Sequence, residues 1–129
     1  MTDPIADMLN RLKNAQSAKK EAVEVPYSRM KYALAKVLER KGFVKAVEIK
    51  GKKVRRVIDI ALRYTEGMPR ITGTKRISKP GQRVYAPCDA IRKTKGGRGI
   101  SVLSTSKGLL SNAEAKKENM GGEIMCEVW

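Results

Sequence analysis

Hydrophobic residues at helical spacing indicate two amphipathic helices in the first third of the chain. Apolar residues recur at every third or fourth position after Pro4 and again after Ser28. Asp3 and Pro4 are typical of an N-cap followed by a first helical residue, and Ser28 is typical of a second N-cap. Gly42 is placed to end the second helix. Between the helices, the β-rich run at 22–25 predicts a short strand.

After the second helix, alternating apolar and polar residues predict an antiparallel hairpin. Phe43, Val47 and Ile49 fall on one side of its first strand. Lysines surround a glycine at 50–53, which indicates a basic hairpin tip. The returning strand, 54–62, is expected to place four apolar residues on one face: Val54, Ile58, Ile60 and Leu62.

The pattern divides the chain into two lobes. Residues 1–63 follow the order helix, strand, helix, strand, strand, which describes an N-terminal α/β lobe. Residues 64–69 contain Thr, Glu, Gly and Pro, and this composition predicts a linker. Residues 70–129 are mostly strand-like with one short helix, so we expect a β-rich C-terminal lobe. The predicted fold class is α+β, built as two small lobes.

Turn residues separate several short strands in the C-terminal lobe. The expected strands lie at 70–77, 83–85, 100–103 and 123–129. A turn is predicted at 78–81, one helical turn after Pro87, and a basic glycine-rich loop at 92–99. In the last strand the alternation sends Met125 and Trp129 to one face and the following residues to the other: Ile124, Cys126 and Val128.

Two polar turns flank the short helix of this lobe. The motif Ser-Thr-Ser-Lys-Gly at 104–108 follows the apolar run 100–103, so we expect its three hydroxyls at the end of a strand. Ser111 and Glu114 have capping-box spacing and predict the start of the helix. The glycines at 121–122 are expected to stop it. Both polar turns are therefore placed to face the same ligand.

Charge indicates the class of that ligand. The chain has 28 Lys and Arg against 13 Asp and Glu, a net charge of +15, and no His. Such a surface attracts polyanions. No stretch reaches the ~18 apolar residues of a membrane span, and no leader resembles a signal peptide. We therefore expect a soluble intracellular protein with no membrane partner.

The cysteines do not indicate a metal site. Cys88 and Cys126 are too far apart for a Cys-x-x-Cys motif, and the usual zinc ligand sets are excluded without His. Free cysteine is among the most buried residue types. We expect both side chains to be buried small hydrophobes, and we expect no cofactor.

Enzymatic alternatives are weak. Ser104 to Lys107 formally matches the Ser-x-x-Lys motif of penicillin-binding acyl-transfer enzymes, but the accompanying Ser-Asp-Asn and Lys-Thr-Gly motifs are absent. The lack of His excludes a Ser-His-Asp triad. Gly96 to Gly99 fits the Gly-x-x-Gly loop of KH modules, yet that loop joins two helices and here a strand follows. No phosphate-binding loop motif is present. We expect neither catalysis nor a small-molecule substrate.

Nucleic-acid binding is the function class that remains, and the residue types of the two polar turns are suited to contact folded RNA. Short hydroxyls can donate to and accept from ribose 2′-hydroxyls, and glycines allow close backbone approach. Glu123 has a functional and a structural interpretation. In the first, its carboxylate accepts from an RNA amino or hydroxyl group, or holds a neighbouring Lys in place. In the second, it is a surface charge on an edge strand. Tyr85 either stacks on a base or belongs to the core. The polar face of the first helix, which includes Arg11 and Asn14, is either solvated surface or a phosphate-contacting ridge.

Several motifs together resemble one known family, bacterial small-subunit ribosomal protein eight. These are Ser-Thr-Ser-Lys-Gly at 104–108, Met-Gly-Gly-Glu at 120–123 near an aromatic C-terminus, and Ala115 with a following basic pair. The opening Asp-Pro-Ile-Ala-Asp-Met at 3–8 and Ser-Lys-Pro-Gly at 78–81 are also similar. The resemblance covers essentially the whole chain. It departs at Asn112, where an acidic residue is expected.

The resemblance implies a two-lobed, non-enzymatic, cytoplasmic protein that binds the central domain of 16S rRNA and helps to assemble the platform of the small subunit. It implies contacts with small-subunit proteins five and twelve. Some members repress their own operon, so messenger RNA that mimics the ribosomal site is an alternative RNA partner. The implied C-terminal RNA-binding residues are Arg83, Tyr85, Ser104, Thr105, Ser106, Lys107, Gly108, Gly121, Gly122 and Glu123. A second RNA segment would touch the first helix at Pro4, Arg11 and Asn14.

Overall fold

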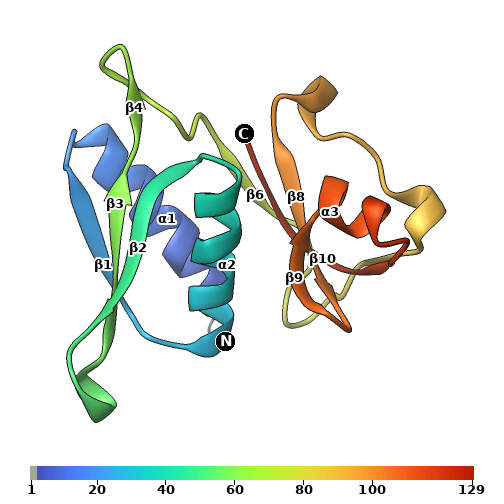
Figure 1. The fold of residues 1–129 in the computed structure, drawn as a ribbon, viewed down its shortest axis with the longest axis horizontal. Helices are drawn as coiled ribbons and strands as arrows, with labels where there is room; N and C mark the ends of the chain where they lie inside the picture. Colours follow the sequence, from blue (N-terminus) through green and yellow to red (C-terminus); the bar gives the residue numbers. More distant parts are fainter. Residues whose placement is uncertain (1–2) are drawn as a thin grey trace. The chain divides into compact units, whose positions relative to one another are not determined.

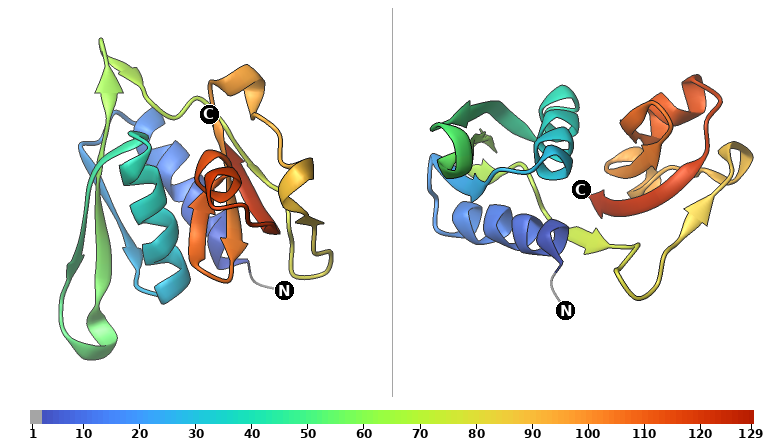
Figure 2. Two further views of the ribbon diagram at one scale, coloured as in Figure 1. Left: turned by 45° about the vertical axis from the view of Figure 1, so that its right-hand side comes forward. Right: turned by 90° about the horizontal axis from the view of Figure 1, so that it is seen from below.

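Two helices cover one face of an antiparallel sheet in the first half of the chain (Figures 1 and 2). The structure is a computed structural model that describes residues 3–129. The helices are α1 (Pro4–Ser17) and α2 (Arg29–Arg40). The sheet has the order β1-β3-β2, and its strands are β1 (Ala22–Pro26), β2 (Val44–Lys50) and β3 (Val57–Leu62). The predicted order of elements is confirmed.

Local chemistry explains where α2 begins and ends. The Ser28 hydroxyl accepts a hydrogen bond from the Lys31 amide at 3.1 Å, as its N-cap position predicts. After the C-cap residue Lys41, Gly42 takes a φ of +79°, which suits a residue without a side chain. The buried faces of α1 and α2 meet the inner face of the sheet, where Ile58 and Ile60 are fully buried.

The β2–β3 hairpin differs from its predicted pattern at both ends. β3 begins at Val57, so Val54 falls in the short 3₁₀ helix η1 (Lys53–Arg55) and is 98% exposed. The prediction that Val54 shares the buried face of the strand is wrong. At the other end, a register shift between Val44 and Ala46 buries Val44 beside Phe43. Ile49, nearer the tip, is exposed.

Residues 64–69 form a hairpin where the sequence predicts a linker. β4 (Tyr64–Thr65) pairs with β5 (Met68–Pro69). The Tyr64 hydroxyl donates to the Lys20 carbonyl, and Lys19 Nζ donates to the Gly67 carbonyl. These bonds attach the hairpin to the first unit, which spans Pro4–Ile71. The second unit contains Thr72–Trp129 together with Asp3.

The second unit is a five-stranded sheet with the order β6-β10-β8-β9, in which β7 also pairs with β10. Its strands are β6 (Thr74–Arg76), β7 (Tyr85–Ala86), β8 (Ile100–Thr105), β9 (Gly108–Ser111) and β10 (Gly122–Val128). The helical elements are α3 (Asn112–Lys117) and the 3₁₀ helices η2 (Cys88–Ala90) and η3 (Lys95–Gly97). This mostly β unit with one α-helix agrees with the predicted fold class.

A bulge in β10 changes the predicted alternation of its side chains. The register with β8 shifts between Ile124 and Cys126, and both Met125 and Cys126 are buried as a result. Burial raises the pKa of the Cys126 thiol to about 12. Cys126 is thus the buried hydrophobe that was expected, whereas Cys88 is only partly buried. The turn predicted at 78–81 is present, closed by paired hydrogen bonds between Lys79 and Gln82.

The short helix α3 starts as predicted and stops differently. The Ser111 hydroxyl accepts from the Glu114 amide at 3.2 Å, and the Glu114 carboxylate accepts from the Ser111 amide at 2.9 Å. The helix ends at its C-cap, Glu118, and Asn119 follows with a φ of +55°. The prediction that the glycines at 121–122 stop the helix is therefore wrong, because an asparagine adopts the left-handed conformation first.

Within residues 3–129, no helix is long and apolar enough to cross a bilayer. The same residues contain no group of three His, Cys, Asp or Glu side chains that is arranged to hold a metal ion.

Candidate nucleic-acid interface

The three hydroxyls of the 104–108 motif lie at the end of a strand, as predicted. Ser104 and Thr105 are the last residues of β8, Ser106 and Lys107 form the turn, and β9 starts at Gly108. Gly108 has a φ of +92°, and a Cβ there would meet no atom within 4 Å. Its backbone is therefore open to a ligand.

The hydroxyls have different structural roles. Thr105 Oγ1 accepts from the Lys107 amide at 3.1 Å and donates to the Gly108 carbonyl at 2.8 Å, so it holds the turn together. Among residues 3–129, neither the Ser104 nor the Ser106 hydroxyl has a hydrogen-bond partner. Ser106 is exposed, and Ser104 is partly buried. Two of the three hydroxyls thus have their hydrogen-bonding capacity available to a ligand.

Glu123 lies in the interior of the sheet, between two other candidate residues. The register places it opposite Ser104 of β8 on one side and Tyr85 of β7 on the other. The edge-strand interpretation of Glu123 is therefore wrong, because β10 is paired on both sides. Residues that are far apart in the sequence form one row across three strands, Ser104–Glu123–Tyr85, which we call the recognition row.

Hydrogen bonds fix the Glu123 carboxylate. Its Oε2 atom accepts from the Ser78 hydroxyl at 2.5 Å and from Arg83 Nη1 at 3.2 Å. Ser78 is completely buried, and its oxygen also accepts from the Val84 amide at 3.0 Å. Glu123 thus holds a neighbouring cation, as one interpretation proposed, but that cation is Arg83 and not a lysine. The ion pair reduces the negative charge that an RNA phosphate would otherwise meet.

The Tyr85 ring is available for stacking. The side chain is 70% exposed, so the alternative that places Tyr85 in the core is wrong. Arg83 lies two residues before it and is also exposed. An exposed aromatic ring beside a cation is a common arrangement for contacting an unpaired base and its phosphate.

Gly121 and Gly122 are required by contacts within the protein. A Cβ on Gly122 would lie 2.2 Å from the Ser104 carbonyl oxygen, and one on Gly121 would lie 2.5 Å from the Ala86 carbonyl oxygen. The two glycines thus let the chain at the start of β10 approach β8 on one side and the end of β7 on the other. They assemble the recognition row from its separate strands.

Lys107 and the first helix carry the remaining predicted residues. Lys107 Nζ pairs with Glu118 Oε2 at 3.1 Å, and both side chains are exposed. Pro4, Arg11 and Asn14 are exposed on α1, which belongs to the first unit, where Arg11 Nε pairs with Asp7 Oδ2 at 3.1 Å. The C-terminal candidates therefore belong to the second unit, whereas the α1 candidates belong to the first.

Ser78 was missed as a site residue by sequence reasoning, which assigned it to a turn and to a motif shared with the family but gave it no role in the site. It lies 45 residues from Glu123 in the chain, and no local motif links them. The one signal in the sequence is that Ser78 stands immediately before Lys-Pro-Gly, and a turn is enough to explain a serine at that position.

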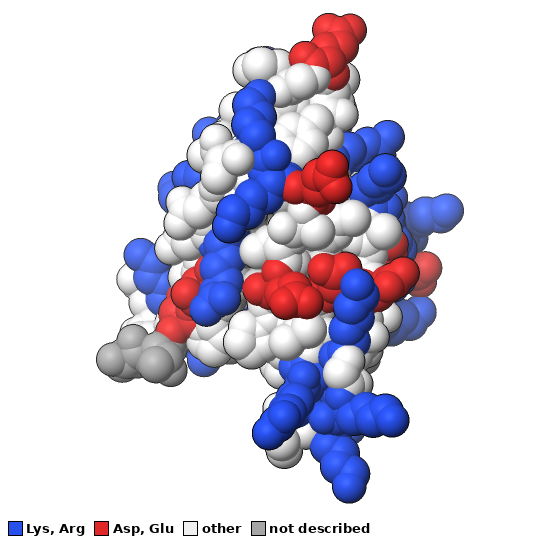
Figure 3. All heavy atoms as spheres, turned by 90° about the vertical axis from the view of Figure 1, so that its left-hand side faces the viewer, with Lys and Arg blue, Asp and Glu red and all other residues white. Residues whose placement is uncertain are grey.

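The outer face of the β1-β3-β2 sheet has a different character. Figure 3 shows a band of acidic side chains across this face and a cluster of basic side chains at one end. The band corresponds to Glu24, Asp59 and Glu48, which are paired across the three strands. Like charges at this density repel RNA, so the sheet face itself is a poor RNA surface.

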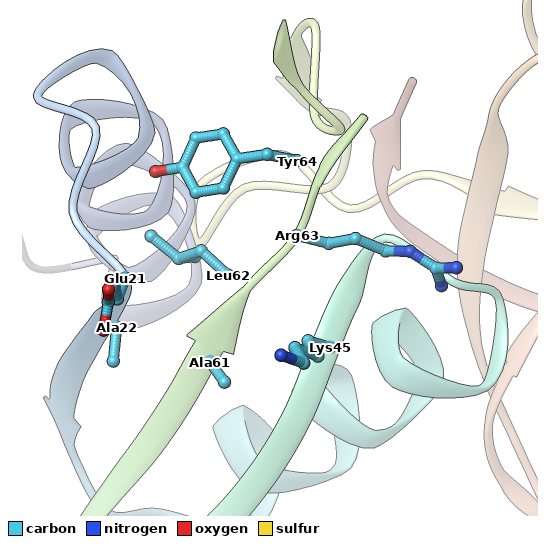
Figure 4. A pocket seen from close by; sticks show the side chains of 7 residues that line it. All are labelled: Glu21, Ala22, Lys45, Ala61, Leu62, Arg63 and Tyr64. Carbon is cyan, nitrogen blue, oxygen red and sulfur yellow. The ribbon is translucent and has the colours of Figure 1, made fainter. Parts of the chain in front are cut away.

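An open depression of about 770 Å³ lies on the same sheet. Ala22 and Ala61 are paired in neighbouring strands, and their short side chains leave space between Lys45 and Tyr64 (Figure 4). None of its lining residues is a His or Cys, and its one carboxylate is Glu21. This lining does not form an acid–base pair or a metal site.

Comparison with known proteins identifies the family. The model of the family described as ribosomal protein S8 matches residues 3–129. A relative from Clostridioides difficile (strain 630), named small ribosomal subunit protein uS8, is 52% identical over 130 residues, which cover 100% of this chain and 98% of the relative. A protein of the same name from Caldanaerobacter subterraneus subsp. tengcongensis is 51% identical over 130 residues, with the same coverage. The chain therefore belongs to the ribosomal protein S8 family.

Proposed function

We propose that this protein is a structural component of the small ribosomal subunit that binds the central domain of 16S rRNA and helps to assemble the platform. Family membership supports the ribosomal role. The observation that carries the RNA-binding site is the recognition row, with open hydroxyls at Ser104 and Ser106 and an exposed ring at Tyr85. As in its relatives, the role is structural and not enzymatic, and its place is the ribosome in the cytoplasm.

The row provides groups that recognise the shape of folded RNA. Serine hydroxyls donate to and accept from ribose 2′-hydroxyls, which distinguish RNA from DNA. Tyr85 would stack on an unpaired base, and Glu123, held in place by Ser78, would accept from a base amino group or a 2′-hydroxyl. Such contacts require a distorted or bulged helix, because a regular A-form helix hides its base edges.

The cations around the row would supply affinity. Lys107 and Arg83 lie at its margins. Lys107 is paired with the exposed carboxylate of Glu118, and Arg83 is paired with the carboxylate of Glu123, which also accepts from Ser78. Contacts of this kind neutralise phosphates and release counterions, so binding weakens as salt rises. Gly108, with no atom within 4 Å of its Cβ position, allows the backbone to approach the ligand closely.

The exposed face of α1 would contact a second RNA segment through Pro4, Arg11 and Asn14. These residues are spaced seven and three apart, so they follow one side of the helix. The proposed function also includes contacts with small-subunit proteins five and twelve, which are supported by the family resemblance.

The test uses Ser106→Ala, which removes one open hydroxyl. Its affinity for a central-domain RNA hairpin should fall by roughly 1–3 kcal/mol, with the salt slope almost unchanged because no cation is lost. Thr65→Ala, which removes an exposed hydroxyl from β4 outside the proposed sites, is the matched control and should bind like the wild type. Unchanged affinity of Ser106→Ala would contradict the proposed recognition.

A free-standing repressor that binds messenger RNA is the second candidate, because messenger that mimics the ribosomal site would meet the same row. Sedimentation separates the two roles. A ribosomal component should move with intact small subunits after a wash in high salt, whereas a repressor alone should stay in the free fraction.

A further inference from the structure

The tip of the β2–β3 hairpin is the most cationic segment of the first unit. Five of its seven residues are Lys or Arg, and none is acidic. We call residues 50–56 the basic tip. Its cationic residues are Lys50, Lys52, Lys53, Arg55 and Arg56.

The basic tip has a defined conformation. Gly51 has a φ of +88°, and a Cβ there would lie 2.4 Å from the Arg55 carbonyl oxygen. Arg56 Nε donates to the Lys53 carbonyl at 3.2 Å, and its guanidinium lies 4.2 Å from the centre of the Tyr27 ring. The chain therefore closes tightly on Gly51, and Arg56 anchors the turn to the body of the unit.

The cations at the end of the turn are unpaired. Lys50 is bound to Asp59 at 3.2 Å, and Arg56 is stacked on Tyr27. In contrast, Lys52, Lys53 and Arg55 form no ion pair within the part of the chain that the structure describes, and all three are exposed. Three free cations thus surround Val54, an apolar residue with almost no protein contact.

The surroundings restrict what can approach. The acidic band of Glu24, Asp59 and Glu48 crosses the sheet beside the basic tip, as Figure 3 shows. A polyanion that lay across the sheet would be repelled by this band. It is attracted to the end of the hairpin, where basic side chains are gathered without acidic ones.

We propose that the basic tip is an additional RNA contact, in which Lys52, Lys53 and Arg55 bind phosphates of an rRNA segment and Val54 lies against a ribose. The inference rests on the proposed function. RNA is favoured over an acidic protein because three free cations within four residues match the dense, regular charge of a phosphate backbone. The contact would add affinity without reading sequence, because it offers neither an aromatic ring nor an open hydroxyl.

The experiment compares two variants of the full chain that lose the same charge. Lys52, Lys53 and Arg55 are changed to Ala in one variant, and the exposed residues Lys20, Arg29 and Lys45 of the same unit are changed to Ala in the control. Affinity for a central-domain rRNA fragment is measured over a series of salt concentrations. The salt slope of the tip variant should fall by about 2–3, since each lost phosphate contact removes about 0.7–0.9. The control should keep a slope close to that of the wild type.

Two results would overturn the inference. One is a tip variant with the wild-type slope, and the other is an equal reduction in tip variant and control, which would mean that only total charge matters. Neither result affects the recognition row, because Ser106→Ala tests that site by affinity at constant slope. If the wild-type protein bound no rRNA fragment, the proposed function would fail instead.

A tethered probe identifies what lies against the tip in assembled subunits. Val54→Cys, made in a Cys88→Ala background, carries an iron chelate that generates hydroxyl radicals, and Cys126 is too buried to be labelled. Cleavage of rRNA near residue 54 is expected. Cleavage of a neighbouring protein without cleavage of rRNA would show that the tip contacts an acidic protein, and the inference would be wrong. Circular dichroism of each variant confirms that the loss of slope does not come from unfolding.

Discussion

The recognition row and the basic tip present two different kinds of polar surface. The row is built from three strands and is held by the buried hydroxyl of Ser78, so its groups have fixed directions. The basic tip is one continuous segment whose end carries free charges and an exposed Val54. Groups with fixed directions can recognise the shape of a ligand, while unpaired surface charges supply affinity and a fast encounter.

The comparison explains why a protein with a charge of +15 keeps a glutamate in its candidate RNA site. At the recognition row, Ser78 and Arg83 fix the orientation of the Glu123 carboxylate, so it can accept a hydrogen bond in a defined direction. Arg83 also offsets its negative charge. At the basic tip a carboxylate would only reduce the attraction for phosphate. At the recognition row, the orientation of a charged side chain therefore matters more than the sign of its charge.

The largest expected effect breaks the row itself. In Gly122→Ala the new methyl group would lie 2.2 Å from the Ser104 carbonyl oxygen, so β10 and β8 must separate. We expect the second unit to lose roughly 3 kcal/mol or more of stability, measured by urea unfolding with the fluorescence of Trp129, the only tryptophan. Gly81→Ala is the control, because nothing lies within 4 Å of its Cβ position. Equal stability of the two variants would contradict the close approach.

The next effect separates orientation from recognition. Ser78→Ala removes the donor to Glu123 and leaves the Val84 amide without its partner, so we expect a loss of about 2–3 kcal/mol of stability and weaker RNA binding. Ser106→Ala should weaken RNA binding with no loss of stability, since its hydroxyl has no partner among the described residues. If Ser78→Ala left both stability and binding unchanged, the row would not depend on this buried support.

The smallest effect concerns the first unit and its dependence on pH. The pKa of Glu39 is lowered, first by its hydrogen bond with Lys36 at 2.7 Å, and Glu39 also accepts from the Val47 amide at 3.2 Å, which joins α2 to β2. A lowered pKa stabilises the fold above the unfolded value near 4.5, and this stabilisation is lost as pH falls through the folded value.

Glu39→Gln tests this linkage. The variant should be less stable than the wild type by about 0.5–1 kcal/mol at pH 7 and nearly equal to it at pH 3, measured by urea unfolding with far-UV circular dichroism. Glu66→Gln, an exposed residue of the β4–β5 hairpin, serves as the control and should show no such difference. A difference that persisted at pH 3 would mean that the ionised carboxylate is not the cause.

Local signals in the sequence predicted local features well. Ser28 and the Ser111–Glu114 pair marked helix starts, because each cap depends on hydrogen bonds between residues three apart. The hydroxyls of 104–106 marked the end of a strand, where Thr105 closes the turn through bonds to residues 107 and 108. Predictions failed where a neighbour in space intervened. The shifts at Val44 and in β10 depend on pairing with another strand, and no alternation within one segment reveals a bulge.

The sequence by itself determined the α+β class, the cationic character and the family, because periodicity, composition and motifs are properties of the chain read in order. Only the tertiary structure decided that Ser104, Glu123 and Tyr85 form one row, that Ser78 supports it, and that the two glycines serve strand pairing. These relations join residues about 20 to 45 positions apart. Burial and register, which exist only after the strands have paired, are what bring them together.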